Sequence, residues 1–229
     1  MNKLILILCL FMFSMSAIAQ GNRIQFSNAK PFDENRYSEI NKSPYFFSDW
    51  VKGTIYDIHK VEYKDVWLNY NGYEKEIEVY NEGEFIQLST RDYFKVVVNT
   101  SDNPKVFQSE EAFTYVFMRF FHHSFADEFI IVLYEGEKVR FGRNYIVKVA
   151  EVVTEDVGQR RVLKNFVERN VYYMMIDGEI QPVTLKAKSI VSALPNTKVA
   201  ESIVKEQRLK LKDEQEVIKF LKTYEERAK

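Results

Sequence analysis

The chain contains almost no cysteine. Of its 229 residues only Cys9 is a cysteine, and it lies inside an apolar run near the N-terminus. A chain with one cysteine cannot build a disulfide framework, so a hydrophobic core has to stabilise its fold. Hydrophobic residues make up 46% of the sequence, which is enough for one domain of this length.

An excess of charge of either sign is also missing. The 32 lysines and arginines are balanced by 33 acidic residues, and both kinds are spread along the chain. Such a chain has no single-sign field that would attract the phosphate backbone of a nucleic acid. We therefore expect no nucleic-acid partner.

Short motifs for the common enzyme chemistries do not occur either. The sequence has no G-x-S-x-G nucleophile elbow, no Walker A loop, no dinucleotide-binding fingerprint and no H-E-x-x-H zinc motif. We therefore expect no cofactor, and the absence of these motifs favours a binding protein over an enzyme.

The N-terminus has the pattern of a secretory signal peptide. Lys3 supplies a positive charge, an apolar run follows from Leu4, and Ala17 and Ala19 form an A-x-A cleavage site. The run is shorter than the roughly 20 apolar residues that a membrane span needs, so a retained anchor is the less favoured alternative. We predict cleavage after Ala19 and export to the periplasm or the outer membrane.

The next part of the mature chain predicts a sheet. Residues 20–44 are polar and irregular, which predicts a loosely packed lead-in. Residues 45–183 form an antiparallel β region in which apolar and polar side chains alternate with the period of two that strands have. The predicted strands cover 51–58, 66–70, 74–79, 85–88, 93–99, 114–122, 129–135, 138–141, 145–153 and 171–176. The runs at 114–121 and 129–134 are apolar on both faces and predict covered central strands.

Tight turns join several of these strands. Asn71-Gly72 is the strongest hairpin signal, because a type I′ turn needs positive φ at both central positions. The sequence NEGE at 81–84 and the pair Asp177-Gly178 predict further turns. The sheet is therefore expected to be a meander.

The C-terminal part predicts helices. Residues 155–170 interrupt the strand series and predict a short amphipathic helix or an ordered connection. After Val183 the apolar period changes to 3.6, and Asp213 with Glu216 forms a capping-box-like helix start. The order of elements predicts an α+β fold: a meandering antiparallel β-sheet, sandwich-like or strongly curved, with the C-terminal helices of residues 184–229 packed on it.

One candidate active site surrounds two adjacent histidines. His122 and His123 are followed closely by Asp127 and Glu128, so a hydrolase or a metal-dependent enzyme is one alternative. Adjacent residues of a strand point to opposite faces, and the spacing matches no standard ligand motif. We favour a polar pair at the end of a hairpin and predict no metal site.

A second candidate consists of Glu74, Glu76 and Glu78. Alternate strand residues lie about 6.6–6.8 Å apart, which is within the range for the carboxylates of an inverting glycosidase. A row of like charges is more typical of a solvated face that discourages edge pairing, and we favour that interpretation.

A third candidate is a basic cluster. It suits an anionic surface such as a lipid headgroup or an acidic glycan, and it consists of Arg160, Arg161, Lys164 and Arg169. Acidic neighbours favour a solvent-facing connection instead, with at most peripheral membrane contact. The aromatic residues, 15% of the chain, suit either a platform for a carbohydrate or apolar ligand or ordinary core and cross-strand pairs. Strand propensity favours the second.

Several segments together resemble an uncharacterised family of secreted proteins that is common in Bacteroidota. They are SPYFFSDWVKGTIYD, VWLNYNGYEKEIEVY, EFIIVLYEGEKVRF, VYYMMIDGEIQPVTLKAKSIVSAL and EVIKFLKTYEE, which extend over roughly residues 43–224. The resemblance implies export across the inner membrane of a Gram-negative cell, and it carries over no active residues.

These observations favour an exported, non-enzymatic binding or scaffolding protein of the cell envelope. Its expected partner is an envelope protein or a glycan, and the sequence leaves the oligomeric state open. The alternatives are an enzyme that uses the His122 and His123 region and a carrier of an apolar ligand. A carrier would have a lined cavity between the sheet and the helices.

Overall fold

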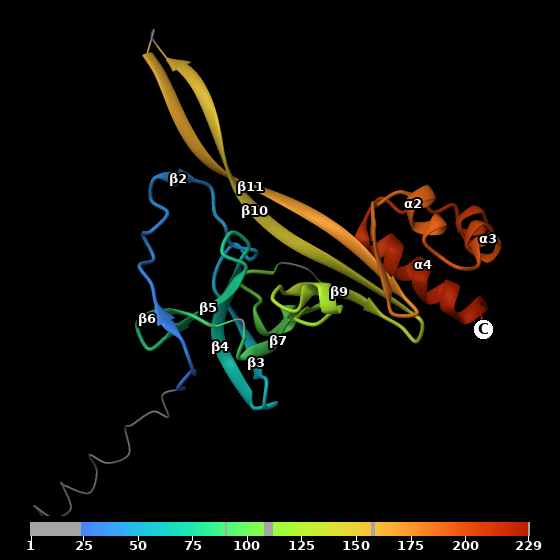
Figure 1. The fold of residues 1–229 in the computed structure, drawn as a ribbon, viewed down its shortest axis with the longest axis horizontal. Coiled ribbons are helices and arrows are strands. Elements are labelled where there is room, and N and C mark those ends of the chain that lie inside the picture. The colour runs from blue at the N-terminus through green and yellow to red at the C-terminus, as the bar shows by residue number, and fades with distance from the viewer. Residues whose placement is uncertain (1–23, 90, 108–111, 157–158, 229) are drawn as a thin grey trace, which may run out of the picture.

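The fold is an open, mainly antiparallel sheet followed by helices, as the computed structural model shows (Figure 1). The structure describes residues 24–89, 91–107, 112–156 and 159–228. Within them, the α+β class and the antiparallel sheet are confirmed. The predicted signal peptide, its cleavage site after Ala19 and Cys9 lie outside the described residues.

The sheet has twelve strands and one break in its meander. Across the sheet the order is β1-β6-β5-β4-β3-β7-β8-β9-β10-β11-β12, and β2 pairs with β11 in parallel. The strands are β1 (Lys30–Pro31), β2 (Ile40–Asn41), β3 (Val51–Asp57), β4 (Glu62–Asn71), β5 (Glu76–Asn81), β6 (Glu84–Gln87), β7 (Tyr93–Asn99), β8 (Thr114–Met118), β9 (Ile130–Glu135), β10 (Val139–Asp156), β11 (Gln159–Ile176) and β12 (Glu179–Val183). After β6 the chain returns past β3 to begin a second meander at β7.

The turn signals are confirmed at two of three positions. Glu82 and Gly83 join β5 to β6, and Asp177 and Gly178 join β11 to β12; all four have positive φ, as a type I′ turn requires. The prediction of a two-residue turn at Asn71-Gly72 is wrong. Asn71 is the last residue of β4 and pairs with Glu76, so the turn covers residues 72–75.

The largest difference from the sequence prediction lies in β10 and β11. Residues 155–170 were expected to form a helix or a connection, but residues 155–156 and 159–170 belong to β10 and β11, two strands of 18 residues each that pair along their whole length. The predicted strands 138–141 and 145–153 are likewise one strand. Figure 1 shows the far half of this hairpin extending away from the rest of the sheet.

The core lies between the curved sheet and the elements that cover it. β9 is covered on both faces as expected, because Ile131 and Leu133 belong to the main core while Ile130 and Val132 form a smaller cluster with Phe121. On β4, Val66, Leu68 and Tyr70 are buried in the main core, as their alternation predicts.

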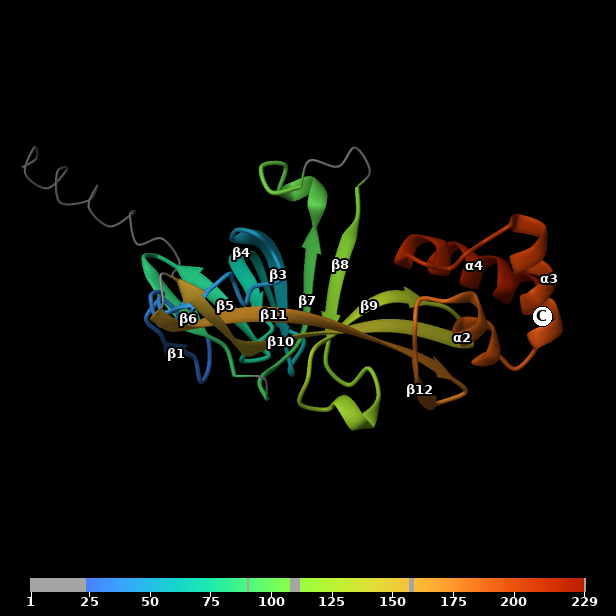
Figure 2. The same cartoon turned by 90° about the horizontal axis from the view of Figure 1, so that it is seen from above.

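The three described helices follow β12: α2 (Ala187–Ser192), α3 (Thr197–Gln207) and α4 (Glu214–Arg227). Asn196 caps α3 and Asp213 caps α4, since their side-chain oxygens accept hydrogen bonds from the amides of Val199 and Glu216. Figure 2 shows the helices gathered at one end of the sheet, opposite β1, β5 and β6. None of the described helices has both the length and the apolar character that crossing a bilayer requires.

Glu225 of α4 attaches the helices to the sheet. Its carboxylate accepts hydrogen bonds from the amides of Lys138 at 2.9 Å and Val139 at 2.8 Å and from the hydroxyl of Tyr134 at 2.8 Å. Burial alone raises the pKa of Glu225, but these hydrogen bonds together hold it below its ordinary value. The turn between β9 and β10 is thereby bound to the last helix.

Candidate functional site

The two histidines lie in the connection between β8 and β9. Their ring centroids are 3.7 Å apart. The Nδ1 atom of His122 accepts a hydrogen bond from the amide of Ser124 at 3.2 Å, so His122 caps the short 3-10 helix His123–Phe125. The pair lies between two strands that pair with each other, and His122 stabilises the local turn there.

The two acidic residues predicted to act together with the histidines interact with other side chains instead. Glu128 binds the ammonium group of Lys75 at 2.6 Å and the amide of Asn144 at 2.7 Å. Asp127 is exposed and lies 3.5 Å from the guanidinium of Arg119. Across the described ranges, no three His, Cys, Asp or Glu side chains are grouped so that they could hold a metal ion.

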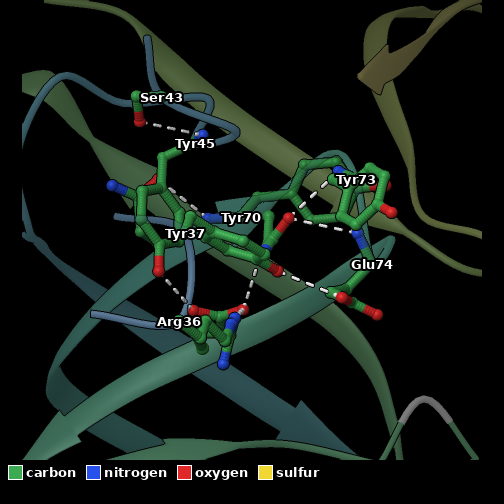
Figure 3. A network of polar contacts seen from close by, with 10 residues as sticks. Arg36, Tyr37, Ser43, Tyr45, Tyr70, Tyr73 and Glu74 are labelled. Atoms are coloured by element: carbon green, nitrogen blue, oxygen red, sulfur yellow. Dashed lines mark hydrogen bonds and ion pairs between the residues drawn. The ribbon is translucent and has the colours of Figure 1, made fainter. Parts of the chain in front are cut away.

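Glu78 is the centre of a buried polar network, part of which Figure 3 shows. Its carboxylate forms an ion pair with Arg36 and accepts hydrogen bonds from the Tyr45 hydroxyl and the Asn71 amide, each at 2.7 Å. The prediction that Glu78 belongs to a solvated face is therefore wrong, because its side chain has no exposed surface. The sequence missed this because Arg36 and Tyr45 come from segments distant in the chain.

The network offsets part of the cost of burying the Glu78 carboxyl group. Burial raises the pKa of the Glu78 carboxyl, while the hydrogen bonds from Tyr45 and Asn71 and the charge of Arg36 oppose that rise. The donors occupy both carboxylate oxygens, which leaves Glu78 no free position facing a substrate. The geometry consequently does not favour a glycosidase pair among Glu74, Glu76 and Glu78.

The same network fixes the lead-in to the sheet. Arg36 stacks over the Phe32 ring at 3.9 Å, and Tyr37 packs against Phe166 of β11 with ring centroids 5.2 Å apart. Residues 24–44 are mostly irregular and mostly exposed, but the network anchors them to the sheet at particular points. They supply β1 and β2, and β2 pairs with Lys164 and Asn165 of β11.

The basic cluster lies on the projecting half of the β10–β11 hairpin. We call residues 150–156 and 159–165 the arm. Arg160, Arg161 and Lys164 belong to the arm and are exposed, and Arg169 lies on β11 nearer the body. The four residues are on a strand rather than a connection, which corrects the prediction for this segment.

Strand alternation divides this cluster between two faces. Arg160 and Lys164 share one face of the ribbon, whereas Arg161 lies on the other. On their own face, Arg160 is directly opposite Glu155 and Lys164 is directly opposite Glu151. Opposite charges on facing residues reduce the positive potential, so the arm is not a strong site for an anionic surface.

Apolar side chains are exposed on both faces of the arm. Val152 is opposite Leu163 on one face, and Val153 is opposite Val162 on the other. These four side chains have between 42% and 54% of their surface exposed. A strand that packs against the rest of the protein buries one of its two faces. The arm exposes both of its faces, so it exposes more apolar surface than an ordinary surface strand does.

The edges of the arm are also incompletely paired. β2 pairs with β11 only at Lys164 and Asn165, and within the described residues β11 is the only strand that pairs with β10 beyond Arg143. Free edge amides and carbonyls can accept an added strand. The arm therefore offers apolar faces and backbone hydrogen bonds at one place.

The hollows between the sheet and the helices contain several charged side chains. One of about 240 Å³ is lined by Val139, Ile176 and Tyr224 together with Lys138 and Glu225. Another of about 400 Å³ is lined by Tyr134 and by the charged residues Glu135, Glu137, Lys222, Glu225 and Glu226. Cavities that hold a small apolar ligand usually have volumes of about 300–1,000 Å³ and a mostly apolar lining. The geometry does not favour a carrier of an apolar ligand at this position.

No protein-family model matches the chain, and neither the curated proteins nor the solved structures contain a significant match.

Proposed function

We propose that this chain is an exported cell-envelope protein that acts as a non-enzymatic binding or scaffolding module, and that the arm binds a protein partner. The observation that carries the proposal is the exposure of paired apolar residues on both faces of a projecting two-stranded ribbon.

Three physical arguments support a protein partner for the arm. A two-stranded ribbon is marginally stable in water by itself, so added contacts would stabilise it. Contiguous exposed apolar residues are typical of interaction surfaces. A partner strand can extend the sheet through main-chain hydrogen bonds while its side chains cover the apolar faces.

The proposal is tested with a double variant of the mature protein, Val153→Thr with Val162→Thr. Threonine keeps the branched shape that suits a strand but replaces a methyl group by a hydroxyl. Affinity capture from a native envelope extract, with quantitative identification of the captured proteins, should show at least one protein that the wild type retains and the variant loses.

A matched control comes from the loop between β3 and β4. Ile58 and Val61 are 48% and 49% exposed, so Ile58→Thr with Val61→Thr removes similar apolar surface at a site distant from the arm. The control should capture the same proteins as the wild type. Identical capture by the arm variant and the wild type would contradict the proposed role of the arm.

Export is supported by the charged, apolar and small-residue pattern of the first 19 residues. Cell fractionation and N-terminal sequencing of the expressed full chain should find Gln20 as the first residue of a protein in the envelope fraction. An unprocessed protein in the cytoplasm would contradict this part of the proposal and leave the arm experiment valid.

A further inference from the structure

Both tryptophans of the chain, Trp50 and Trp67, lie on one exposed surface of the first meander. Trp67 on β4 is directly opposite Tyr80 on β5, which in turn is opposite Phe85 on β6. The Phe85 ring lies 5.4 Å from that of Trp50 and 5.0 Å from that of Tyr80, measured between centroids. We call Trp50, Trp67, Tyr80 and Phe85 the aromatic strip.

The strip lies on the face of the sheet that the core leaves uncovered. The neighbours of Trp67 on β4, Val66 and Leu68, point into the core, so Trp67 points away from it. Trp67 and Tyr80 are 43% and 40% exposed. Single exposed aromatic residues are ordinary, but adjoining ones on a hollowed surface are typical of binding grooves.

Two hollows adjoin at the strip. One of about 370 Å³ extends from Trp50 and Trp67 toward Asn103 and Val106. The other, of about 800 Å³, is open and extends over Tyr80 and Phe85. Because Asp49, Trp50 and Trp67 line both, the two hollows form one groove, which we call the aromatic groove.

Charged side chains surround the rings. The lining contains the carboxylates of Glu34, Asp49 and Asp102 and the ammonium groups of Lys52 and Lys105. Three negative and two positive charges do not favour an anionic ligand, and a purely apolar ligand would remove water from charged groups without replacing their hydrogen bonds. Some of these groups already have partners: the Lys52 ammonium lies 5.5 Å from the centroid of the Trp67 ring, and the Asp49 carboxylate accepts a hydrogen bond from the Trp50 amide at 2.7 Å. A neutral ligand with both apolar faces and hydroxyl groups suits this mixed lining.

A sugar ring has this combination of surfaces. Its C–H bonds carry a small positive charge and suit the electron-rich faces of tryptophan and tyrosine. Its hydroxyl groups can donate hydrogen bonds to carboxylates and accept them from ammonium groups. The open shape of the groove and its two parts match a chain of sugar units better than a single enclosed one.

Buried amides hold both walls of the groove in place. Asn69 is 2% exposed, and it donates hydrogen bonds of 3.0 Å to the carbonyls of Phe47 and Asp49, just before Trp50. Asn103 is 5% exposed. Its side-chain oxygen accepts a hydrogen bond from the backbone amide of Lys52 at 2.6 Å, and its side-chain nitrogen donates one to the backbone carbonyl of Lys52 at 2.9 Å. A groove whose walls are fixed before binding loses less entropy when the ligand arrives.

We propose that the aromatic groove binds a neutral oligosaccharide of at least two units, with Trp67 and Trp50 stacking on sugar rings and Asp49 accepting hydrogen bonds from hydroxyl groups. This site is independent of the arm, so the protein would join a protein partner to a glycan.

The test uses a panel of neutral oligosaccharides: gluco-, xylo-, manno- and N-acetylglucosamine oligomers. Since both tryptophans lie in the groove, the intrinsic tryptophan emission of the mature protein reports directly on binding, and calorimetry supplies the affinity. At least one oligomer should shift the emission, and Trp67→Ala should weaken its binding by at least about tenfold.

Two controls separate the groove from the rest of the protein. Phe120→Ala removes another exposed aromatic side chain, 53% exposed and outside the groove, and should bind the sugar as the wild type does. The arm variant Val153→Thr with Val162→Thr should also keep sugar binding, so failure of the arm proposal and failure of this one are distinguishable. The inference is overturned if no oligomer binds at millimolar concentration, if only anionic polysaccharides bind, or if Trp67→Ala binds as tightly as Phe120→Ala.

Discussion

The two ends of the β10–β11 hairpin consist of the same pair of strands but differ in what surrounds them. At the base, β9 and β12 flank the hairpin, α4 binds the turn that precedes it, and Phe141 and Met174 are fully buried. In the arm, Val152 and Leu163 are opposite each other in the same way, yet both are more than 40% exposed. Backbone pairing extends the ribbon, whereas burial of side chains determines how far the stable core reaches.

Between the two ends lies a short region that the lead-in supports. Tyr37 packs against Phe166, and β2 pairs with Lys164 and Asn165, the arm residues of β11 nearest the body. Val147 of β10 donates a hydrogen bond of 2.9 Å to the carbonyl of Gly72. The network around Glu78 thus sets the point at which the supported part of the hairpin ends and the arm begins.

The largest expected effect is at the base. Phe141 is fully buried, pairs with Met174 and stacks with Tyr172 at a centroid distance of 5.8 Å. Phe141→Ala should lower the free energy of unfolding by roughly 3–5 kcal/mol, because it removes a buried ring and leaves a cavity. Urea denaturation followed by circular dichroism measures the change. A loss below about 1 kcal/mol would mean that the base is not part of the core.

The fold was predictable where the pattern is local. The turns at Glu82-Gly83 and Asp177-Gly178 and the cap Asp213 depend on residues within a few positions of one another, and the structure confirms them. The two-residue turn predicted at Asn71-Gly72 does not form because the side-chain Oδ1 of Asn71 accepts hydrogen bonds from the backbone amides of Tyr73 and Glu74, at 3.0 and 3.1 Å, which stabilises a longer turn.

The hairpin and the site were not predictable because their causes are distant in the chain. The apolar residues of 159–167 fit a helical stripe as well as they fit a strand, and only the partner strand β10 decides between the two. Burial of Glu78 depends on Arg36, 42 residues before it. In the aromatic strip, Trp67 and Tyr80 alternate with core residues, so the sequence pattern places them on the opposite face of the sheet. Whether another part of the protein covers that face depends on the whole fold and cannot be read from the local pattern.

A smaller effect is expected where the lead-in supports the hairpin. Arg36→Met keeps the length of the side chain but leaves Glu78 buried without its ion-pair partner, which should lower the free energy of unfolding by about 3 kcal/mol at neutral pH. Arg169→Met is a matched control, because Arg169 is exposed and forms no ion pair with a described residue. It should change stability by less than about 0.5 kcal/mol.

The pH dependence of this loss identifies the carboxylate. Burial raises the folded-state pKa of Glu78 above its ordinary value of 4.5, so its contribution to stability is complete below that value and decreases as pH rises through the folded pKa. Removal of Arg36 raises the folded pKa further. The difference in unfolding free energy between wild type and Arg36→Met should therefore be smallest near pH 4 and grow toward pH 7. A difference that does not depend on pH would show that Arg36 acts by packing alone.

The smallest effect is expected in the arm. Leu163→Ala removes a large apolar side chain, as Phe141→Ala does, but Leu163 is 42% exposed and lies beyond the supported part of the hairpin. The free energy of unfolding of the isolated mature protein should change by less than about 0.5 kcal/mol. The measurement is repeated over a range of protein concentrations, because an arm that pairs with a second copy would make the unfolding midpoint rise with concentration. A loss comparable to that of Phe141→Ala, or such a concentration dependence, would mean that the arm is already covered in solution and that its partner is another copy of this chain.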